Sequence, residues 1–205
     1  MSKIKSEDLE KAIAEVVKKL TGIDNLYPNQ HELILSLIKS DNIFYTASTN
    51  SGKTLPAVIY PDILKYLNSL GYSFPASPKL LFVTALNSLK LSLVNNVKSI
   101  GINCEAVTSE NLKELLDSST SVLFISPEVL KQPGVTQMLI LHRAMFVLKV
   151  VDEAHLGKGS GHENYLVAVV VLLLVLTPSV TVTAEIFLIW ANVARTNVTV
   201  TVGIC

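Results

Sequence analysis

Short apolar runs alternate along the chain with longer segments in which apolar residues recur at helical spacing. The runs fall at 43–46, 80–83, 104–107, 122–125 and 146–151, and each has the length of a buried strand. Two of them include one charged residue, Glu105 and Lys149. The segments between them have the periodicity of amphipathic helices. This repeated order of strand, helix and strand predicts an α/β fold, in which a parallel sheet lies in three layers with helices on both faces.

Three residues mark where helices are expected to begin or end. Gly22 is expected to stop a first helix, because glycine readily takes the left-handed conformation at a helix end. Pro61 is expected to kink the helix around it or to end that helix early, because proline lacks a backbone N–H. Ser109 is expected to cap a later helix.

Composition narrows the possible classes of protein. The 205 residues allow one substantial domain, and the formal net charge of zero means that any binding of nucleic acid has to be local. Cys104 and Cys205 lie too far apart in sequence to indicate a disulfide framework or a zinc site. The charged segment Met1–Glu10 lacks the apolar core of a signal peptide. We therefore expect a reduced, intracellular protein.

A candidate phosphate-binding loop follows the first apolar run and opens a helix. Its residues are Ala47, Ser48, Thr49, Asn50, Ser51, Gly52, Lys53 and Thr54. Backbone N–H groups of such a loop bind phosphates, Lys53 would reach the β and γ phosphates, and Thr54 would ligate Mg²⁺. Ala47 stands where the strict pattern has glycine, and the alternative is a plain glycine-containing turn.

An acidic pair follows the apolar run 146–151. At the end of such a strand Asp152 can hold Mg²⁺ and Glu153 can polarise the water that attacks a γ-phosphate. The alternative is an exposed acidic turn.

Two further polar residues are candidates for ligand contacts. Gln30 has one acceptor and two donors, which suits the N6 and N7 edge of adenine, although a solvated glutamine in a first helical turn is the alternative. Thr84 follows the run 80–83 and can bind a nucleic-acid phosphate, whereas capping by Asn87 or Ser88 is the simpler interpretation of that segment.

The segment 166–176 is wholly apolar. It is shorter than the ~18 residues that a membrane-spanning helix needs, so a core segment is expected and a membrane segment is the alternative. The residues 179–184 that follow have the pattern of a strand with a polar end.

Six of these motifs occur in the order of the first lobe of a superfamily-two helicase, which the chain resembles. They are Gln30, Gly52-Lys53-Thr54, Val83-Thr84-Ala85-Leu86, Ser126-Pro127-Glu128, Asp152-Glu153-Ala154-His155 and Thr181-Val182-Thr183-Ala184. Among such enzymes the chain is most similar to the RecQ-like DNA helicases. Their aromatic-rich loop aligns without gaps with 156–165, which keeps Gly161 and His162 but has Ser160, Asn164 and Tyr165 at the Trp, Phe and Arg positions.

The resemblance implies a RecA-like lobe that uses ATP and Mg²⁺. The residues that would bind ATP are Gln30, Ala47, Ser48, Thr49, Asn50, Ser51, Gly52, Lys53 and Thr54. The catalytic residues would be Lys53, Asp152 and Glu153, and Mg²⁺ would lie on Thr54 and Asp152. The residues that would contact nucleic acid or couple it to the nucleotide are Thr84, Ser126, His155, His162, Thr181 and Thr183.

The resemblance divides the chain into an N-terminal helical segment (1–22), the ATP-binding lobe (23–185) and a divergent or truncated tail (186–205). It implies 3′-to-5′ movement on single-stranded DNA, with RNA as the other substrate, in the nucleus and without membrane contact. Because a second lobe is missing, the chain by itself is expected to bind ATP weakly and to unwind nothing. The alternatives are an inactive helicase-like binding module and a P-loop kinase. The kinase is disfavoured because Arg143 and Arg195 are the chain's arginines.

Overall fold

The computed structural model describes residues 4–39, 43, 45, 51–84 and 87–152. Four parallel strands form one sheet in the spatial order β2-β3-β1-β4. The strands are β1 (Lys79–Val83), β2 (Cys104–Ala106), β3 (Val122–Ile125) and β4 (Phe146–Val151). The four apolar runs at these positions are therefore strands, and the predicted parallel sheet is confirmed.

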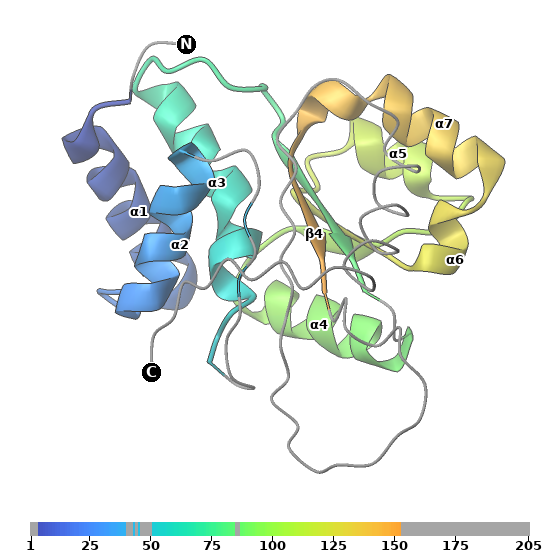
Figure 1. Ribbon diagram of the computed structural model, residues 1–205, viewed down its shortest axis with the longest axis horizontal. Coiled ribbons are helices and arrows are strands. Elements are labelled where there is room, and N and C mark those ends of the chain that lie inside the picture. The colour runs from blue at the N-terminus through green and yellow to red at the C-terminus, as the bar shows by residue number, and fades with distance from the viewer. Residues whose placement is uncertain (1–3, 40–42, 44, 46–50, 85–86, 153–205) are drawn as a thin grey trace.

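Helices cover both faces of this sheet. Figure 1 shows α1 (Ser6–Thr21), α2 (Pro28–Lys39) and α3 (Leu55–Ser69) on one side. On the other side lie α5 (Leu112–Asp117), α6 (Pro127–Leu130) and α7 (Pro133–Leu141). The helix α4 (Asn87–Ser99) packs against β2, and its Val94 and Val97 belong to the core cluster of α1, α2 and α3. A short 3₁₀ helix, η1 (Arg143–Met145), leads into β4. The three-layer α/β fold is thus the one that the alternating pattern predicts.

Alternate strand residues divide the core into two halves. In β1, Leu80 and Phe82 belong to the cluster that includes α1, α2 and α3, whereas Leu81 and Val83 belong to the cluster under α5, α6 and α7. This follows from the two-residue side-chain period of a strand. Phe82 also packs on Phe124 of β3, with ring centroids 5.1 Å apart. Both faces of the sheet are therefore buried, as a parallel sheet requires.

Two of the expected helix boundaries are wrong and one is confirmed. α1 ends at Gly22, whose φ of 71° places it in the left-handed region. In contrast, α3 runs through Pro61 without interruption to Ser69. The buried residues on both sides of Pro61 pack against α1, α2, β1 and β4, and this burial offsets the ~3 kcal/mol that a proline costs inside a helix.

The helix expected to be capped by Ser109 begins three residues later. Asn111 precedes α5, and its side-chain oxygen accepts a bond from the Thr108 N–H at 2.8 Å. In return, the Asn111 N–H donates to the Thr108 hydroxyl at 3.2 Å. This reciprocal pair closes the turn ahead of α5, so Ser109 is not the cap.

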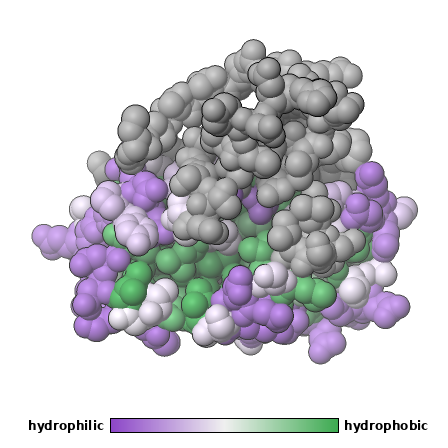
Figure 2. All heavy atoms as spheres, turned by 90° about the horizontal axis from the view of Figure 1, so that it is seen from below, coloured by the Kyte–Doolittle hydropathy of each residue, from purple (hydrophilic) through white to green (hydrophobic). Residues whose placement is uncertain are grey.

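Apolar residues also reach one face of the surface. Figure 2 shows hydrophobic residues gathered in the middle of the described part of that face, with hydrophilic residues around them. None of the described helices is both long enough and apolar enough to cross a membrane. The apolar segment 166–176 lies outside the described residues.

We expect Cys104 to resist alkylation in the folded protein. Its side chain is fully buried, its Sγ lies 3.4 Å from the Val94 carbonyl oxygen, and burial raises the pKa of the thiol to about 11. Little reactive thiolate therefore exists near neutral pH. In a Cys205→Ser variant, iodoacetamide labelling followed by mass spectrometry should modify Cys104 only after denaturant is added. Rapid labelling without denaturant would contradict this packing.

Candidate nucleotide-binding site

Three predicted site residues lie next to one another at the carboxyl edge of the sheet. Val83 pairs with Ile125 on one side and with Val151 on the other. The next residue of each strand is Thr84, Ser126 or Asp152, so the spatial order along the edge is Ser126, Thr84, Asp152. In open α/β sheets this edge is where ligands bind.

Backbone hydrogen bonds fix the edge. The Thr84 N–H donates to the Ile125 carbonyl oxygen at 3.0 Å, and the Asp152 N–H donates to the Val83 carbonyl oxygen at 2.9 Å. The parallel ladder therefore continues one residue beyond each strand. Thr84 and Ser126 are 3% and 2% exposed, whereas Asp152 is half-buried. The backbone that carries the Asp152 side chain is therefore held by the sheet at the end of β4.

The described part of the phosphate loop leads directly into α3. Gly52 has a φ of 69°, and its carbonyl oxygen accepts a bond from the Leu55 N–H at 3.0 Å. The Thr54 carbonyl oxygen accepts the first helical bond, from Val58, at 3.1 Å. Lys53 and Thr54, both half-buried, therefore lie at the N-terminus of α3, where the helix dipole favours an anion.

Gln30 lies against this loop, although it is 21 and 22 residues from its partners in sequence. Its Nε2 donates to the carbonyl oxygens of Ser51 and Gly52, at 3.3 and 3.1 Å, and its Oε1 accepts a bond from the Tyr27 N–H at 3.1 Å. The side chain is 2% exposed, so it is not the solvated glutamine of the alternative interpretation. Sequence reasoning did not predict this contact with the loop.

The loop also carries a buried polar atom that suits a ligand. Among the described residues, the Ser51 hydroxyl has no hydrogen-bond partner. Buried polar atoms in proteins are nearly always satisfied, so such an atom calls for a partner. A hydroxyl, a lysine and a helix N-terminus together fit a phosphate group, and the oxygens of Thr54 and Asp152 are of the type that Mg²⁺ prefers.

Tyr27 is a candidate that the sequence interpretation passed over. Its ring is 69% exposed, yet its backbone N–H is fixed by Gln30. An exposed aromatic ring on a fixed backbone offers a stacking surface for a planar group. The signal in the sequence was an aromatic residue three positions before the glutamine.

The other predicted site residues lie outside the described part of the chain, and their roles stay predictions. They are Ala47, Ser48, Thr49, Asn50, Glu153, His155, His162, Thr181 and Thr183.

Comparison with known proteins gives a family and a fold. The family model described as "DEAD/DEAH box helicase" matches residues 27–188, which is most of the chain. A solved structure titled "Crystal Structure of DUF1998 helicase MrfA bound to DNA" matches with a TM-score of 0.54 and 18% sequence identity. The match covers 77% of this chain and 23% of that one, so at this identity it supports the fold alone. No curated protein matches the chain.

Proposed function

Because the chain belongs to the DEAD/DEAH box helicase family, we propose that it is the ATP-binding lobe of an ATP-dependent, RecQ-like DNA helicase. The observation that carries the proposal is the phosphate loop at the start of α3, which Gln30 holds from α2. This arrangement places Lys53 and a helix N-terminus where an anion is stabilised.

Different residues of the proposed site would bind the phosphates, the metal ion and the attacking water. ATP supplies the phosphoanhydride bond whose cleavage drives such enzymes. Lys53 and the backbone of the loop would bind and orient its phosphates, while Thr54 and Asp152 would hold Mg²⁺. Glu153 orients the attacking water. Lys53 lies just before the start of α3, and Asp152 lies just after the end of β4. Because α3 packs directly on β4, both residues lie on elements that contact each other.

The nucleic acid lies, in this proposal, at the same edge of the sheet. Thr84 and Ser126 end neighbouring strands and would contact phosphates of the DNA backbone, a type of contact that does not depend on sequence. His155, His162, Thr181 and Thr183 would couple that contact to the state of the nucleotide. Single-stranded DNA is the substrate that the RecQ resemblance favours, with RNA as the other candidate. The resemblance also implies movement in the 3′-to-5′ direction.

The proposed helicase activity requires a second lobe. In helicases of this kind, arginines of the second lobe reach the γ-phosphate, and such groups accelerate hydrolysis by about 10³ to 10⁵. The chain spans 23% of the helicase structure that it matches. Hydrolysis and strand separation are therefore proposed for the two lobes together, and nucleotide binding for this one.

We expect this 205-residue chain to bind ATP weakly, in a Mg²⁺-dependent manner, and to separate no strands. Calorimetric titration of ATP with and without Mg²⁺ tests the binding, and a duplex with a single-stranded 3′ tail tests the separation. Robust ATP-dependent unwinding by this chain would contradict the need for a second lobe. The polarity is tested in a protein that carries both lobes, by comparing duplexes with 3′ and 5′ tails.

An inactive binding module is the second candidate function. Ala47 and the Ser160, Asn164 and Tyr165 substitutions in the aromatic loop favour it. Such a module would bind a nucleotide, nucleic acid or a protein without catalysis. In that case Lys53→Ala would have the same nucleotide affinity as the wild type, because the cation of the loop would be idle.

A further inference from the structure

The helix α7 differs from the other described α-helices in its lack of charge. Each of the others contains at least one Asp, Glu or Lys, whereas the nine residues of α7 contain no ionisable side chain. Of its two polar side chains, Thr136 donates to the Leu130 carbonyl oxygen at 2.7 Å and is used within the fold, which leaves Gln137. A helix that is apolar nearly all round is typical of a protein interior. The composition of α7 is therefore that of a helix covered on both sides.

The inner face of α7 is covered, whereas its outer face is open. Val135 and Leu139 are buried in the cluster under α5, α6 and α7. In contrast, Leu141 is 78% exposed, which makes it the most exposed large apolar side chain of the described residues, and its neighbour Ile140 is half-buried. Figure 1 shows α7 at the outer edge of the described fold. Within the described part of the chain, the outer face thus lacks an apolar partner.

We propose that residues 166–176 of this chain pack on the outer face of α7, with Leu141 in the contact. This segment lies outside the described residues and is wholly apolar. Removal of apolar side chains from water is the dominant favourable contribution to folding, so a common interface stabilises both the segment and α7. The two surfaces match chemically, because neither has a charge that the contact would bury without a partner.

The connecting chain is long enough for this contact. Leu141 and Asp152 are 11 residues apart in sequence, so the distance between them is at most about 40 Å. Leu166 follows Asp152 by 14 residues, which can span about 46 Å. The segment can therefore reach α7 from the end of β4.

A second copy of the chain suits this surface less well. The nine residues of α7 extend over about 14 Å. Stable complexes between proteins bury about 1,200–2,000 Å², which is more than one side of so short a helix offers. A segment of the same chain needs no such area, because a short linker keeps its effective concentration in the millimolar range. The surface is therefore assigned to an intramolecular contact.

This contact lies away from the proposed nucleotide site. Leu141 ends α7, and η1 and the start of β4 come next in the chain, so the contact is near the amino end of β4. Asp152 follows the opposite end of that strand. Packing on α7 and binding of a nucleotide can therefore be tested separately.

Photo-crosslinking in the full 205-residue chain tests the contact. The photoreactive amino acid p-benzoylphenylalanine replaces Leu141, and in the matched control it replaces Leu91, which is 63% exposed on α4. We expect irradiation to join position 141 to residues 166–176 of the same molecule, which mass spectrometry identifies in the monomer band. Position 91 should not crosslink to that segment.

Three results of this experiment would overturn the proposal. Crosslinks from position 141 in a dimer band would show that a second copy covers α7. No crosslink from position 141 would show that α7 faces water. Equal yields from positions 141 and 91 would show that the segment has no preferred surface.

Hydrogen–deuterium exchange provides a second measurement. Because a charge in an apolar contact is unfavourable, we expect Leu141→Glu to make exchange of the amides in 166–176 about tenfold faster, whereas Leu91→Glu leaves it unchanged. Leu141 is largely exposed, so the described fold should stay intact, which circular dichroism checks. Equal exchange rates in the wild type and Leu141→Glu would count against the contact. Neither measurement uses a nucleotide, so a failure here is distinct from a failure of the nucleotide site.

Discussion

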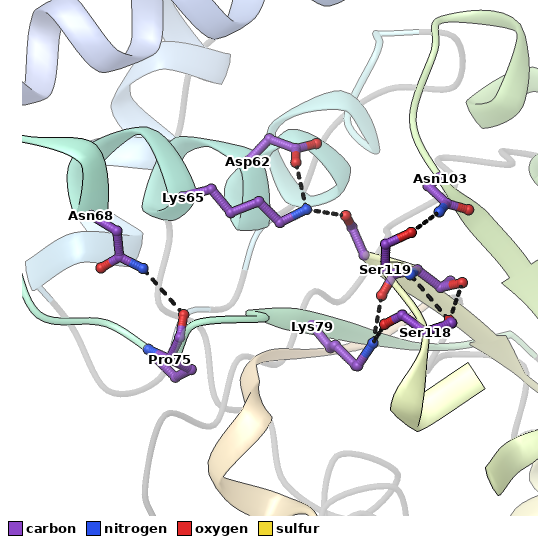
Figure 3. A network of polar contacts seen from close by, with 10 residues as sticks. Asp62, Lys65, Asn68, Pro75, Lys79, Asn103, Ser118 and Ser119 are labelled. Carbon is purple, nitrogen blue, oxygen red and sulfur yellow. Dashed lines mark hydrogen bonds and ion pairs between the residues drawn. The ribbon is translucent and has the colours of Figure 1, made fainter. Parts of the chain in front are cut away.

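Replacing Lys79 by methionine is expected to lower the free energy of unfolding by about 3 kcal/mol. Lys79 opens β1 and is fully buried. Its ammonium group donates to the carbonyl oxygens of Leu115, Ser118 and Thr120, at 3.1, 2.8 and 2.8 Å. Figure 3 shows the side chain reaching the segment around Ser118. Methionine fills the volume but donates nothing, so these carbonyls lose their charged partner.

Two opposing contributions determine this change in the free energy of unfolding. A buried acceptor without a partner costs about 1–3 kcal/mol. The carbonyl oxygens of Ser118 and Thr120 both lose their charged donor, whereas that of Leu115 keeps the Ser118 hydroxyl at 2.9 Å. Against this, burial of an ammonium group is itself unfavourable: desolvation lowers the pKa of Lys79, and the nearby Lys65 lowers it further, while Asp117 raises it. Removing the charge recovers part of that cost. The loss of donors to the carbonyls is the larger contribution, so the variant is expected to be less stable. Lys79 supplies these donors at the C-terminal turn of α5, where carbonyls have no helical partner.

Chemical denaturation of the wild type and the variant measures the difference. Lys113→Met, on the exposed side of α5, is the matched control and should leave the unfolding midpoint almost unchanged. Lys79→Arg should not restore stability, since a planar guanidinium does not match carbonyls that converge on one nitrogen. Equal midpoints for Lys79→Met and Lys113→Met would show that the buried network contributes nothing.

A second lysine extends this network to α3. Lys65 donates to Asp62 at 2.9 Å and to the Ser121 hydroxyl at 2.6 Å (Figure 3). The segment between α5 and β3 is therefore held from β1 by Lys79 and from α3 by Lys65. This is the amino end of the strands, opposite the edge where Thr84 and Asp152 lie. The fold thus fixes both the sheet and the helix of the phosphate loop from the end opposite the proposed nucleotide site.

The parts of the fold that sequence predicted well depend on local pattern. The runs at 80–83 and 122–125 are apolar throughout because both faces of a parallel sheet are buried, and such runs are visible without a structure. Once the strands are parallel, Thr84, Ser126 and Asp152 have to lie at one edge. The neighbourhood of these three residues therefore follows from the parallel sheet, although Ser126 was named as a site residue only through the family resemblance.

The parts that sequence missed depend on contacts between distant segments. Lys79 precedes an apolar run and looks like a solvated strand end, since nothing local shows that carbonyls 36 to 41 residues later converge on it. Pro61 looks like a helix breaker because its neighbours in sequence do not show how deeply α3 is packed. Gln30 was expected to read a base, and its bonds to the phosphate loop depend on how α2 lies against that loop.

Replacing Lys53 by alanine is expected to weaken binding of ATP and of tripolyphosphate about a hundredfold. Lys53 lies at the start of α3 between Gly52, which turns the loop, and Thr54, whose carbonyl begins the helix. A charged hydrogen bond to a phosphate is worth about 1.5–3 kcal/mol, and the half-buried position reduces its screening by water. Alanine keeps the backbone donors of the loop, so residual binding should remain.

Lys11→Ala, on the exposed face of α1, is the control for a general loss of positive charge. Calorimetric titration with Mg²⁺ present compares the three proteins. If Lys53→Ala binds ATP as the wild type does, the cation of the loop is idle, and the inactive binding module becomes the better description of this chain. If it loses both ATP and tripolyphosphate while Lys11→Ala loses neither, the start of α3 is a phosphate site.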